Sequence, residues 1–485
     1  MRTHRRDHPT DLAELARRAM LERGLLPDFT PAVEHEVAAL RPAAMAADIL
    51  DLRTKPWCSI DNDDSRDLDQ LSYSERLPGL IRVHVAVADV DGLVPAGSAS
   101  DRHAAHNTTS VYTPARIFPM LAERLSTDLT SLNQDQDRLA MVARFDVNPS
   151  GEIIASDLFR ARVHNRAKLT YHTVGAWLEG TGPIPAKVAA DPDLPGQVTD
   201  QDEAAQALRT RRQEQGALVL ESIEARAVMQ GGKPIDLRRE AKNRAKELIE
   251  DLMIAANGVA ARFLATHGFA AIRRVVRVPE RWDRIVELAA RHGGHLPAVP
   301  NPKALEAFLV ARRAADPLRF PDLSLSVVKL MGKGEYILER PGDQIGHFGL
   351  AVRDYTHSTA PNRRYPDLLT QRLLKAAIAG TPSPYDDATL AELATHCSDQ
   401  ENAADKVERQ VRKSAAALVL VDRIGERFEA LVTGAANKGT WVRVLNPPVE
   451  GKVVRGARGL DVGDLVRVEL LAVDVEAGFI DFGVV

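Results

Sequence analysis

Ser59-Ile-Asp-Asn-Asp-Asp-Ser-Arg-Asp-Leu-Asp-Gln70 holds five aspartates within nine positions. Carboxylates crowded this closely repel one another, and a bound hard cation is the simplest way to offset the repulsion. The stretch does not fit a calcium-binding helix-loop-helix, because Arg66 and Ser72 stand where that loop needs glycine and glutamate. Two interpretations stay open: a solvated acidic turn, or a site for magnesium, with manganese as a substitute, that serves phosphoryl chemistry.

A second polar stretch favours the metal site: Tyr355-Thr-His-Ser-Thr-Ala-Pro-Asn-Arg-Arg-Tyr-Pro-Asp-Leu368. It supplies Arg363 and Arg364 beside Tyr365, and arginine suits bidentate phosphate binding. An arginine pair alone is usually a surface feature. Combined with the aspartates and with a barrel expected at the carboxyl end, it indicates a nuclease that acts on a single strand.

The residues around these stretches predict a mixed α+β domain of the α/β class over residues 51–420. Residues 81–88 alternate apolar side chains with others, which is typical of a half-buried strand. Apolar residues at helical spacing from Ala245 to Phe263, closed by Gly268, predict a long core helix.

Residues 425–485 predict an all-β barrel of the OB type. Five short apolar runs separated by glycines fit five twisted strands. From Arg427 to Leu460 the sequence has six basic and two acidic residues. Lys438, Trp441 and Arg443 lie there, and basic groups beside an aromatic ring suit single-stranded nucleic acid, although Trp441 could equally be a core residue.

Residues 1–50 predict a small helical unit. Asp11 or Thr10 can cap a first helix that Gly24 ends, and a second helix follows Pro31. Two interpretations stay open: a helix-turn-helix domain, winged or not, and a helical arm packed on the main domain.

Composition excludes several classes of protein. Of the 485 residues, 45% are apolar and 27% charged, as in a globular chain of several domains. No stretch approaches the ~18 apolar residues of a membrane span, and no apolar run follows Met1 as in a secretory signal. Two cysteines exclude a disulfide framework, and a net charge of −4 argues against a DNA-coating protein. We therefore expect a cytoplasmic protein without membrane association, and nothing demands more than a monomer.

Ordered blocks between about Asp51 and Ser414 resemble the ribonuclease II / ribonuclease R (RNB-domain) exoribonucleases. The first block is Ile60-Asp61 followed by Asp67-Leu-Asp69. The others are His84–Asp89, Ser110–Pro114, Pro119–Ser126, Leu169–Val174, Leu248–Asn257, His357–Arg372 and Val407–Arg409. The carboxy-terminal barrel is similar to the OB-fold RNA-binding domain of that family.

The resemblance implies processive, metal-dependent hydrolysis of single-stranded RNA from a free 3′ end to 5′-nucleoside monophosphates, with DNA an unlikely substrate. It also implies roles for residues at matched positions. Asp61 and Gln70 would hold magnesium, Asp67 would support that site, and Asp69 would be the carboxylate most needed for chemistry. Tyr112 would stack on the terminal base, Arg363 would hold the scissile phosphate, and Glu408 would lie near the terminal ribose. Arg364 and Tyr365 are further candidates for RNA contacts.

Three departures from the family pattern bear on function. Gln70 replaces the fourth aspartate, so we expect weaker metal binding. An aromatic clamp expected near Ala225-Arg-Ala227 is missing. Because only sixty residues precede Asp61 here, we expect the two cold-shock domains that usually come before the catalytic domain to be missing.

Two other functions are alternatives to the exoribonuclease. The first is an RNA-binding protein of the same fold that has lost turnover through Gln70; RNA binding alone gains nothing from clustered carboxylates that repel phosphate. The second is a DNA-binding regulator led by the amino-terminal helices, which the seven basic and eight acidic residues of 1–50 do not favour.

Overall fold

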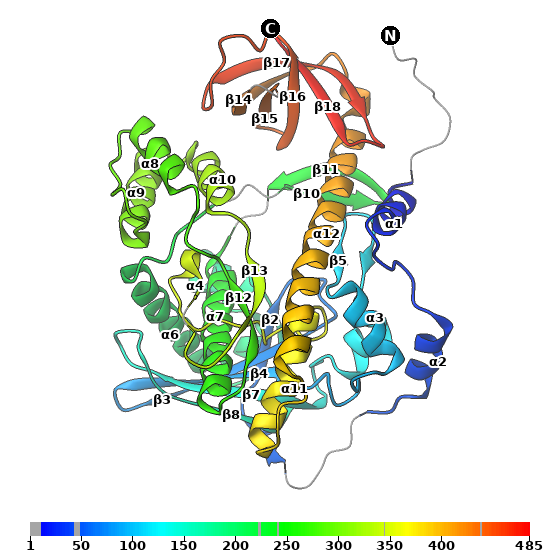
Figure 1. Ribbon diagram of the computed structural model, residues 1–485, viewed down its shortest axis with the longest axis vertical. Helices are drawn as coiled ribbons and strands as arrows, with labels where there is room; N and C mark the ends of the chain where they lie inside the picture. The colour runs from blue at the N-terminus through cyan, green and yellow to red at the C-terminus, as the bar shows by residue number, and fades with distance from the viewer. Residues whose placement is uncertain (1–10, 43–48, 222–224, 240–241, 344, 437–438) are drawn as a thin grey trace.

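A computed structural model of the chain (Figure 1) describes residues 11–42, 49–221, 225–239, 242–343, 345–436 and 439–485. Its centre is a mixed seven-stranded sheet of order β1-β8-β7-β4-β3-β2-β9. The pairs β1–β8 and β2–β9 are parallel and the other neighbours antiparallel. The strands of this sheet are β1 (Leu50–Asp51), β2 (Cys58–Asp61), β3 (Gln70–Leu77), β4 (Leu80–Ala88), β7 (Asp137–Val147), β8 (Ile153–His164) and β9 (Ala167–Thr170).

Helices cover both faces of the sheet and extend to the barrel. They are α1 (Leu12–Glu22), α2 (Pro31–Ala39), α3 (Ala99–Asn107), α4 (Tyr171–Leu178), α5 (Ala186–Ala189), α6 (Leu194–Glu214), α7 (Arg244–Thr266), α8 (Trp282–Arg291), α9 (Pro302–Ala315), α10 (Phe320–Met331), α11 (Tyr365–Ala379) and α12 (Asp387–Leu420). The other helices are a π-helix, η1 (Arg124–Leu129), and two 3₁₀ helices, η2 (Phe348–Leu350) and η3 (Val421–Arg423). None of these described helices has the length and apolar character that crossing a membrane requires.

Three two-stranded ribbons flank this body. They are β5 (Val111–Tyr112) with β6 (Ile117–Phe118), β10 (Ala225–Gln230) with β11 (Lys233–Arg239), and β12 (Ala271–Val275) with β13 (Glu335–Glu339).

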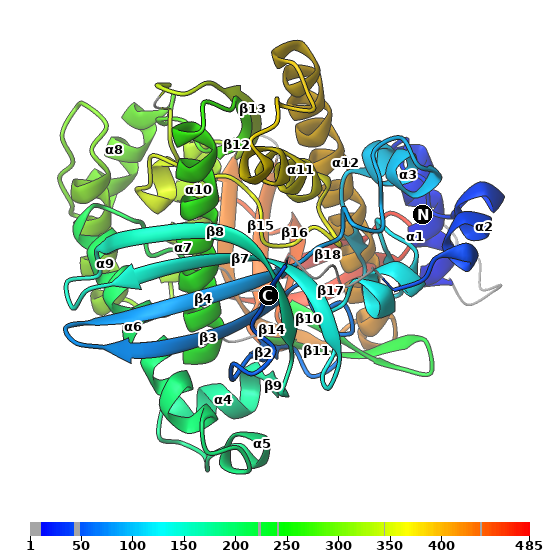
Figure 2. The same ribbon diagram turned by 90° about the horizontal axis from the view of Figure 1, so that it is seen from below.

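Strand β4 and helix α7 show how the sequence pattern produces the core. The predicted long helix is confirmed as α7, which begins at the cap Asn243, whose side chain accepts the Lys246 N–H at 2.9 Å. The predicted strand is confirmed as β4, but the prediction that it is half-buried is wrong. Val83, Val85 and Val87 pack on α6 and α7, while the alternating Ala86 and Ala88 join a second core that includes α11. Both sides of this strand are therefore buried, one of them against α6 and α7, which lie behind the strands in Figure 2.

The amino-terminal helices pack on the main body rather than on each other. Leu15 and Met20 of α1 lie in one hydrophobic cluster with Val407 of α12. Val33 and Val37 of α2 belong to a different cluster, the core beneath the sheet. Of the two alternatives for this segment, the packing is that of a helical arm.

The five predicted strands at the carboxyl end form a closed barrel of order β14-β15-β16-β18-β17. They are β14 (Arg427–Ala436), β15 (Gly439–Val444), β16 (Val449–Arg455), β17 (Leu465–Asp474) and β18 (Phe479–Val484). The barrel lies at the carboxyl end of the long helix α12 (Figure 1), and Ala417 and Leu420 of α12 join its core. The prediction of an α/β body with an all-β barrel is confirmed.

Candidate active site

The acidic stretch is a loop between the end of β2 and the start of β3. Leu68 is buried at its centre, and its N–H donates to the Ser131 hydroxyl at 2.9 Å. The Ser131 hydroxyl in turn donates to the Arg66 carbonyl at 2.9 Å. These two hydrogen bonds fix the loop around Leu68. The neighbouring carboxylates differ in exposure: Asp67 is half-buried and Asp69 is 3% exposed.

Asp69 is the most enclosed carboxylate of the loop. Its Oδ1 accepts the Asn362 N–H at 3.1 Å, whereas its Oδ2 is buried with no hydrogen-bond partner in the described part of the chain. The Nε of Arg363 lies 3.3 Å from that free oxygen. Burial raises the pKa of Asp69 to about 7, although Arg363 favours the ionised form. The Oδ2 oxygen of Asp69 can attract a cation, and the guanidinium of Arg363 beside it can attract a phosphate.

Residues 359–364, which we call the arginine segment, are fixed by contacts with Ser110 and with helix α11. The Arg363 carbonyl accepts the Ser110 N–H at 2.9 Å. Helix α11 follows at once, and its first-turn carboxylate Asp367 accepts from the Ala360 N–H and from Arg364, each at 2.8 Å. Backbone and α11 together therefore orient Arg363 toward Asp69.

Tyr112 contacts Asp67, and Glu408 in turn contacts the backbone of Tyr112. The Tyr112 hydroxyl donates to Asp67 Oδ2 at 3.3 Å, and the Tyr112 N–H donates to Glu408 Oε1 at 2.8 Å. Tyr112 is 37% exposed, so part of its ring is open to a stacking partner. Glu408, on α12, thus positions the strand that carries Tyr112.

Gln70 connects the acidic loop to the arginine segment. Its side-chain Nε2 donates to the Thr359 carbonyl, a bond that an aspartate could not form. Gln70 and Asp69 consequently both bind the backbone between residues 359 and 362.

These residues fit a divalent metal in chemistry but do not form a ready cage for it. Asp61, Asp67 and Asp69 offer hard oxygen donors, and burial raises the pKa of Asp61 as it does that of Asp69. Within the described ranges, however, no three carboxylate, histidine or cysteine side chains converge as metal ligands. Magnesium is usually held by one or two carboxylates together with water and substrate phosphates. Asp69, through its Oδ2, and Asp61 are therefore enough protein ligands for a magnesium ion.

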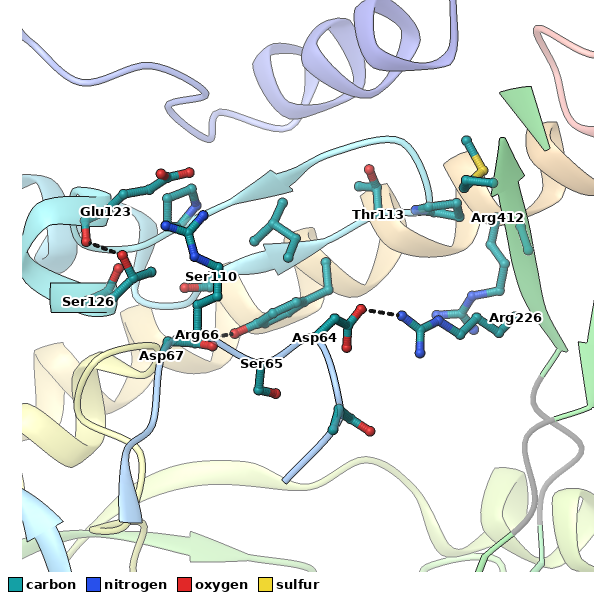
Figure 3. Close-up of a pocket in the computed structure, with 18 residues that line it drawn as sticks. Asp64, Ser65, Arg66, Asp67, Ser110, Thr113, Glu123, Ser126, Arg226 and Arg412 are labelled. Atoms are coloured by element: carbon teal, nitrogen blue, oxygen red, sulfur yellow. Dashed lines mark hydrogen bonds and ion pairs between the residues drawn. The ribbon is translucent and has the colours of Figure 1, made fainter. Parts of the chain in front are cut away.

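A cavity of about 510 Å³ adjoins the acidic loop (Figure 3). Tyr112, Asp64 and Asp67 line it together with the basic residues Arg66, Arg226 and Arg412. In the wall of this cavity Arg226 donates to Asp64 Oδ2 at 2.9 Å, a contact that ties the acidic loop to strand β10. The sequence did not single out Arg226, because only the folded chain places it opposite Asp64. Its planar guanidinium can stack on a base, as the aromatic clamp expected in this stretch would.

Two predicted RNA contacts are wrong. Tyr365 is 4% exposed, and its hydroxyl donates to buried Asp101 at 3.1 Å. Arg443 is 6% exposed and forms two hydrogen bonds, of 2.6 and 2.9 Å, with Asp322 of α10. Both side chains are used to join elements of the protein, so neither is free to bind RNA.

The other predicted contacts have different placements. Arg364 is half-buried and paired with Asp367, as a support for Arg363. Trp441 is half-buried on β15, beside Gly434 of β14. Lys438 lies outside the described residues. The structure therefore brings together Asp61, Asp67, Asp69, Gln70, Tyr112, Arg363 and Glu408, whereas Trp441 and Arg443 lie on strand β15 of the barrel.

We expect replacement of Arg443 by alanine to lower the free energy of unfolding by about 3–5 kcal/mol, because Asp322 would stay buried without its partner. Chemical denaturation measures the change. The double variant Arg443→Met with Asp322→Leu should recover most of the loss. A loss below about 1 kcal/mol for Arg443→Ala, the size expected of an exposed pair, would contradict the assignment.

Residues 49–380 match the family described as "RNB domain", and residues 426–485 match the "RNase II-type exonuclease C-terminal S1 domain". Ribonuclease R of Escherichia coli is 30% identical over 493 residues, which cover 94% of this chain and 60% of that protein. Ribonuclease R 1 of Lactococcus lactis is 30% identical over 416 residues, covering 83% of this chain and 50% of that protein. The chain thus spans half to three fifths of the length of these curated relatives.

The fold is also that of a solved ribonuclease. The Mycoplasma genitalium RNase R in complex with ribose-methylated single-stranded RNA superimposes with a TM-score of 0.89 at 22% identity, covering 98% of this chain and 78% of that one. At this identity the likeness shows the fold. With the RNB match extending over residues 49–380 and the barrel matched separately, the chain belongs to the RNB-domain, ribonuclease II/R family.

Proposed function

We propose that the protein is a 3′-to-5′ exoribonuclease that hydrolyses single-stranded RNA to 5′-nucleoside monophosphates. One observation carries the proposal: the buried oxygen of Asp69 has no hydrogen-bond partner in the described residues, and the guanidinium of Arg363 lies beside it. Such a pair combines a site for a cation with a site for the phosphate being cut. The names of the relatives and the bound RNA of the Mycoplasma protein support the same substrate class.

In this proposal the chain's own residues bind and orient the end of the strand. Arg363 exchanges its contact with Asp69 for the scissile phosphate, which its planar fork can grip at two oxygens. Tyr112 stacks on the terminal base, and Glu408 holds the strand that carries Tyr112. Magnesium, or manganese, bound through Asp61 and Asp69 would supply an activated water and stabilise the leaving oxygen.

The test is incubation of 5′-labelled single-stranded RNA, or the matching DNA, with the protein and magnesium. We expect RNA products that shorten from the 3′ end and no cleavage of DNA. Internal cuts, or equal cleavage of DNA, would overturn the proposal. Binding of RNA without shortening at any magnesium or manganese concentration would favour the second candidate function, an RNA-binding protein without turnover. The amide of Gln70, which replaces a carboxylate and binds Thr359, is the observation that favours that candidate.

Gln70 leads to a prediction about metal dependence. Replacing it by aspartate adds a charge beside Asp69, so we expect half-maximal hydrolysis at a magnesium concentration lower by about tenfold. The same variant loses the bond to the Thr359 carbonyl, so the maximal rate should fall. Magnesium titrations of the native protein, Gln70→Asp and Gln70→Glu measure both effects. Equal midpoints in the native protein and Gln70→Asp would refute the expected gain.

The ion pair between Asp64 and Arg226 leads to a second prediction. Both side chains are more than 60% exposed, and RNA phosphate can replace Asp64 as the partner of Arg226. Asp64→Asn should therefore tighten RNA binding severalfold, and Arg226→Ala should weaken it. In the Arg226→Ala background, Asp64→Asn should act no more strongly than Asp63→Asn, the exposed neighbour outside the cavity lining. A gain for Asp64→Asn that persists without Arg226 would contradict the exchange.

A further inference from the structure

A second cavity, of about 620 Å³, is lined by none of the residues of the acidic loop. Its walls come from the turn between β7 and β8, the carboxyl end of α6, the middle of α7, the start of α9, and residues 351–354. Helices α6 and α9 lie on the opposite side of α7 from α12, as both views show (Figures 1 and 2). Five segments that are far apart in the sequence therefore meet around one opening.

The lining of this cavity is strongly basic. It contains two acidic side chains, Glu152 and Asp354, and five basic ones, Arg211, Arg212, Arg262, Lys303 and Arg353. Two of the five have acidic partners: Arg211 lies 3.4 Å from Glu152, and Arg212 binds buried Asp251. For the other three, no ion pair is found among the residues that the structure describes. With the two paired arginines set aside, three basic side chains share the cavity with the one carboxylate of Asp354, which leaves an excess of two positive charges among the described residues.

Two further features show an unused donor and an incompletely compensated charge among the described residues of this cavity. The Nε of Arg212 is buried and has no hydrogen-bond partner within the described ranges. Burial lowers the pKa of Arg262, an effect that Asp354 offsets only in part. Lys303 is in the first turn of the fourteen-residue helix α9, whose dipole adds to the positive potential, although the side chain of the cap Asn301 already accepts the Ala304 N–H.

We propose that this cavity is a second phosphate-binding site, which takes the phosphate of a nucleotide. Its volume is in the range of small-molecule sites. Several guanidinium groups around one opening favour a phosphate ligand over a carboxylate ligand, because a phosphate offers more oxygens as hydrogen-bond acceptors. The phosphate can come from a free 5′-mononucleotide or from the backbone of an RNA strand. Its identification as the product or the substrate of the enzyme rests on the proposed function, but the binding of phosphate does not.

The position of the cavity connects it to the arginine segment. Asp354, in its wall, precedes Tyr355, whose hydroxyl lies 3.4 Å from Asn257 Nδ2. Asn257 Oδ1 accepts the Ser358 N–H at 2.9 Å, and the next carbonyl binds Gln70. A phosphate in the cavity would therefore lie against the base of the segment that carries Arg363.

Isothermal titration of the full chain with AMP, inorganic phosphate and adenosine tests the site. The background variant Arg363→Ala keeps binding at the first site low. We expect AMP and phosphate to bind, adenosine not to bind, and Lys303→Glu with Arg353→Glu to weaken AMP at least tenfold. Both residues are exposed, so the chain should fold. The matched control is Arg291→Glu with Lys329→Glu, which reverses two exposed charges on α8 and α10.

A second arm uses single-stranded RNA in EDTA and distinguishes the two sources of phosphate. If the backbone is the ligand, the Lys303/Arg353 variant weakens RNA binding and lowers the slope of log affinity against log salt by about 2, while AMP does not bind. Equal effects of the test and control variants in both arms would overturn the proposal, as would the milder Lys303→Gln with Arg353→Gln leaving every affinity unchanged. AMP binding that depends on Lys303 and Arg353, in a protein that does not cleave RNA, would contradict the proposed function alone.

Discussion

Replacing Asp69 by asparagine is expected to lower the rate of RNA hydrolysis by at least about 10³-fold while RNA binding persists. Asparagine has nearly the same shape and can still accept the Asn362 N–H, so the arginine segment keeps its position. What is lost is the negative charge of the buried oxygen that has no other partner in the described residues. Without that charge, residue 69 no longer attracts a cation and no longer neutralises the guanidinium of Arg363.

Single-turnover hydrolysis of 5′-labelled RNA, with RNA affinity measured separately in EDTA, checks this expectation. The matched control is Asp63→Asn, an exposed carboxylate of the same loop, whose rate should stay within about twofold of the native rate because exposed charges are screened. Thermal melting confirms that Asp69→Asn is folded. A variant that keeps more than a tenth of the native rate would show that the chemistry does not depend on Asp69.

The second large effect concerns Arg363. Lysine preserves the charge but not the planar fork, so Arg363→Lys should lower the rate of the chemical step by about 10²-fold. RNA affinity should change much less, because most of it comes from phosphates along the strand. A point charge opposite Asp69 would hold the carboxylate without orienting a phosphate.

Pre-steady-state kinetics separates the two contributions, since the expected change is in the chemical step and not in the RNA concentration at half-saturation. Arg412→Lys is the matched control: Arg412 lines the cavity beside Tyr112, and the change should leave the chemical step within about threefold. If Arg363→Lys mainly raises the RNA concentration at half-saturation, Arg363 binds the strand and does not act on the scissile phosphate.

Features that depend on neighbouring residues in the sequence could be predicted. The periodicities of β4, α7 and the five barrel strands follow from side chains a few positions apart, and the structure has these elements. The acidic loop is a local charge pattern, and its place between two strands follows from the apolar residues on either side. Local patterns could not show that β4 is buried on both faces, because the helices that cover it come from distant parts of the chain.

The errors share the same physical cause. Tyr365 and Arg443 have side chains suited to RNA, but their partners Asp101 and Asp322 are remote in sequence and bury them. Composition shows that a basic or aromatic residue is present, not whether water or RNA can reach it. Arg226 could not be predicted either, because its partner Asp64 is also remote in sequence and only the folded chain brings the two together.

The sequence by itself determined the family, the order of the α/β body and the barrel, and the crowding of carboxylates between residues 59 and 70. Only the tertiary structure decided which carboxylate loses its water and which arginine faces it. Asp69 and Asn362, beside Arg363, are 293 residues apart in sequence and meet because α11 and β3 pack in one body. Desolvation and ion pairing depend on that distance in space, which charge and periodicity along the chain do not contain.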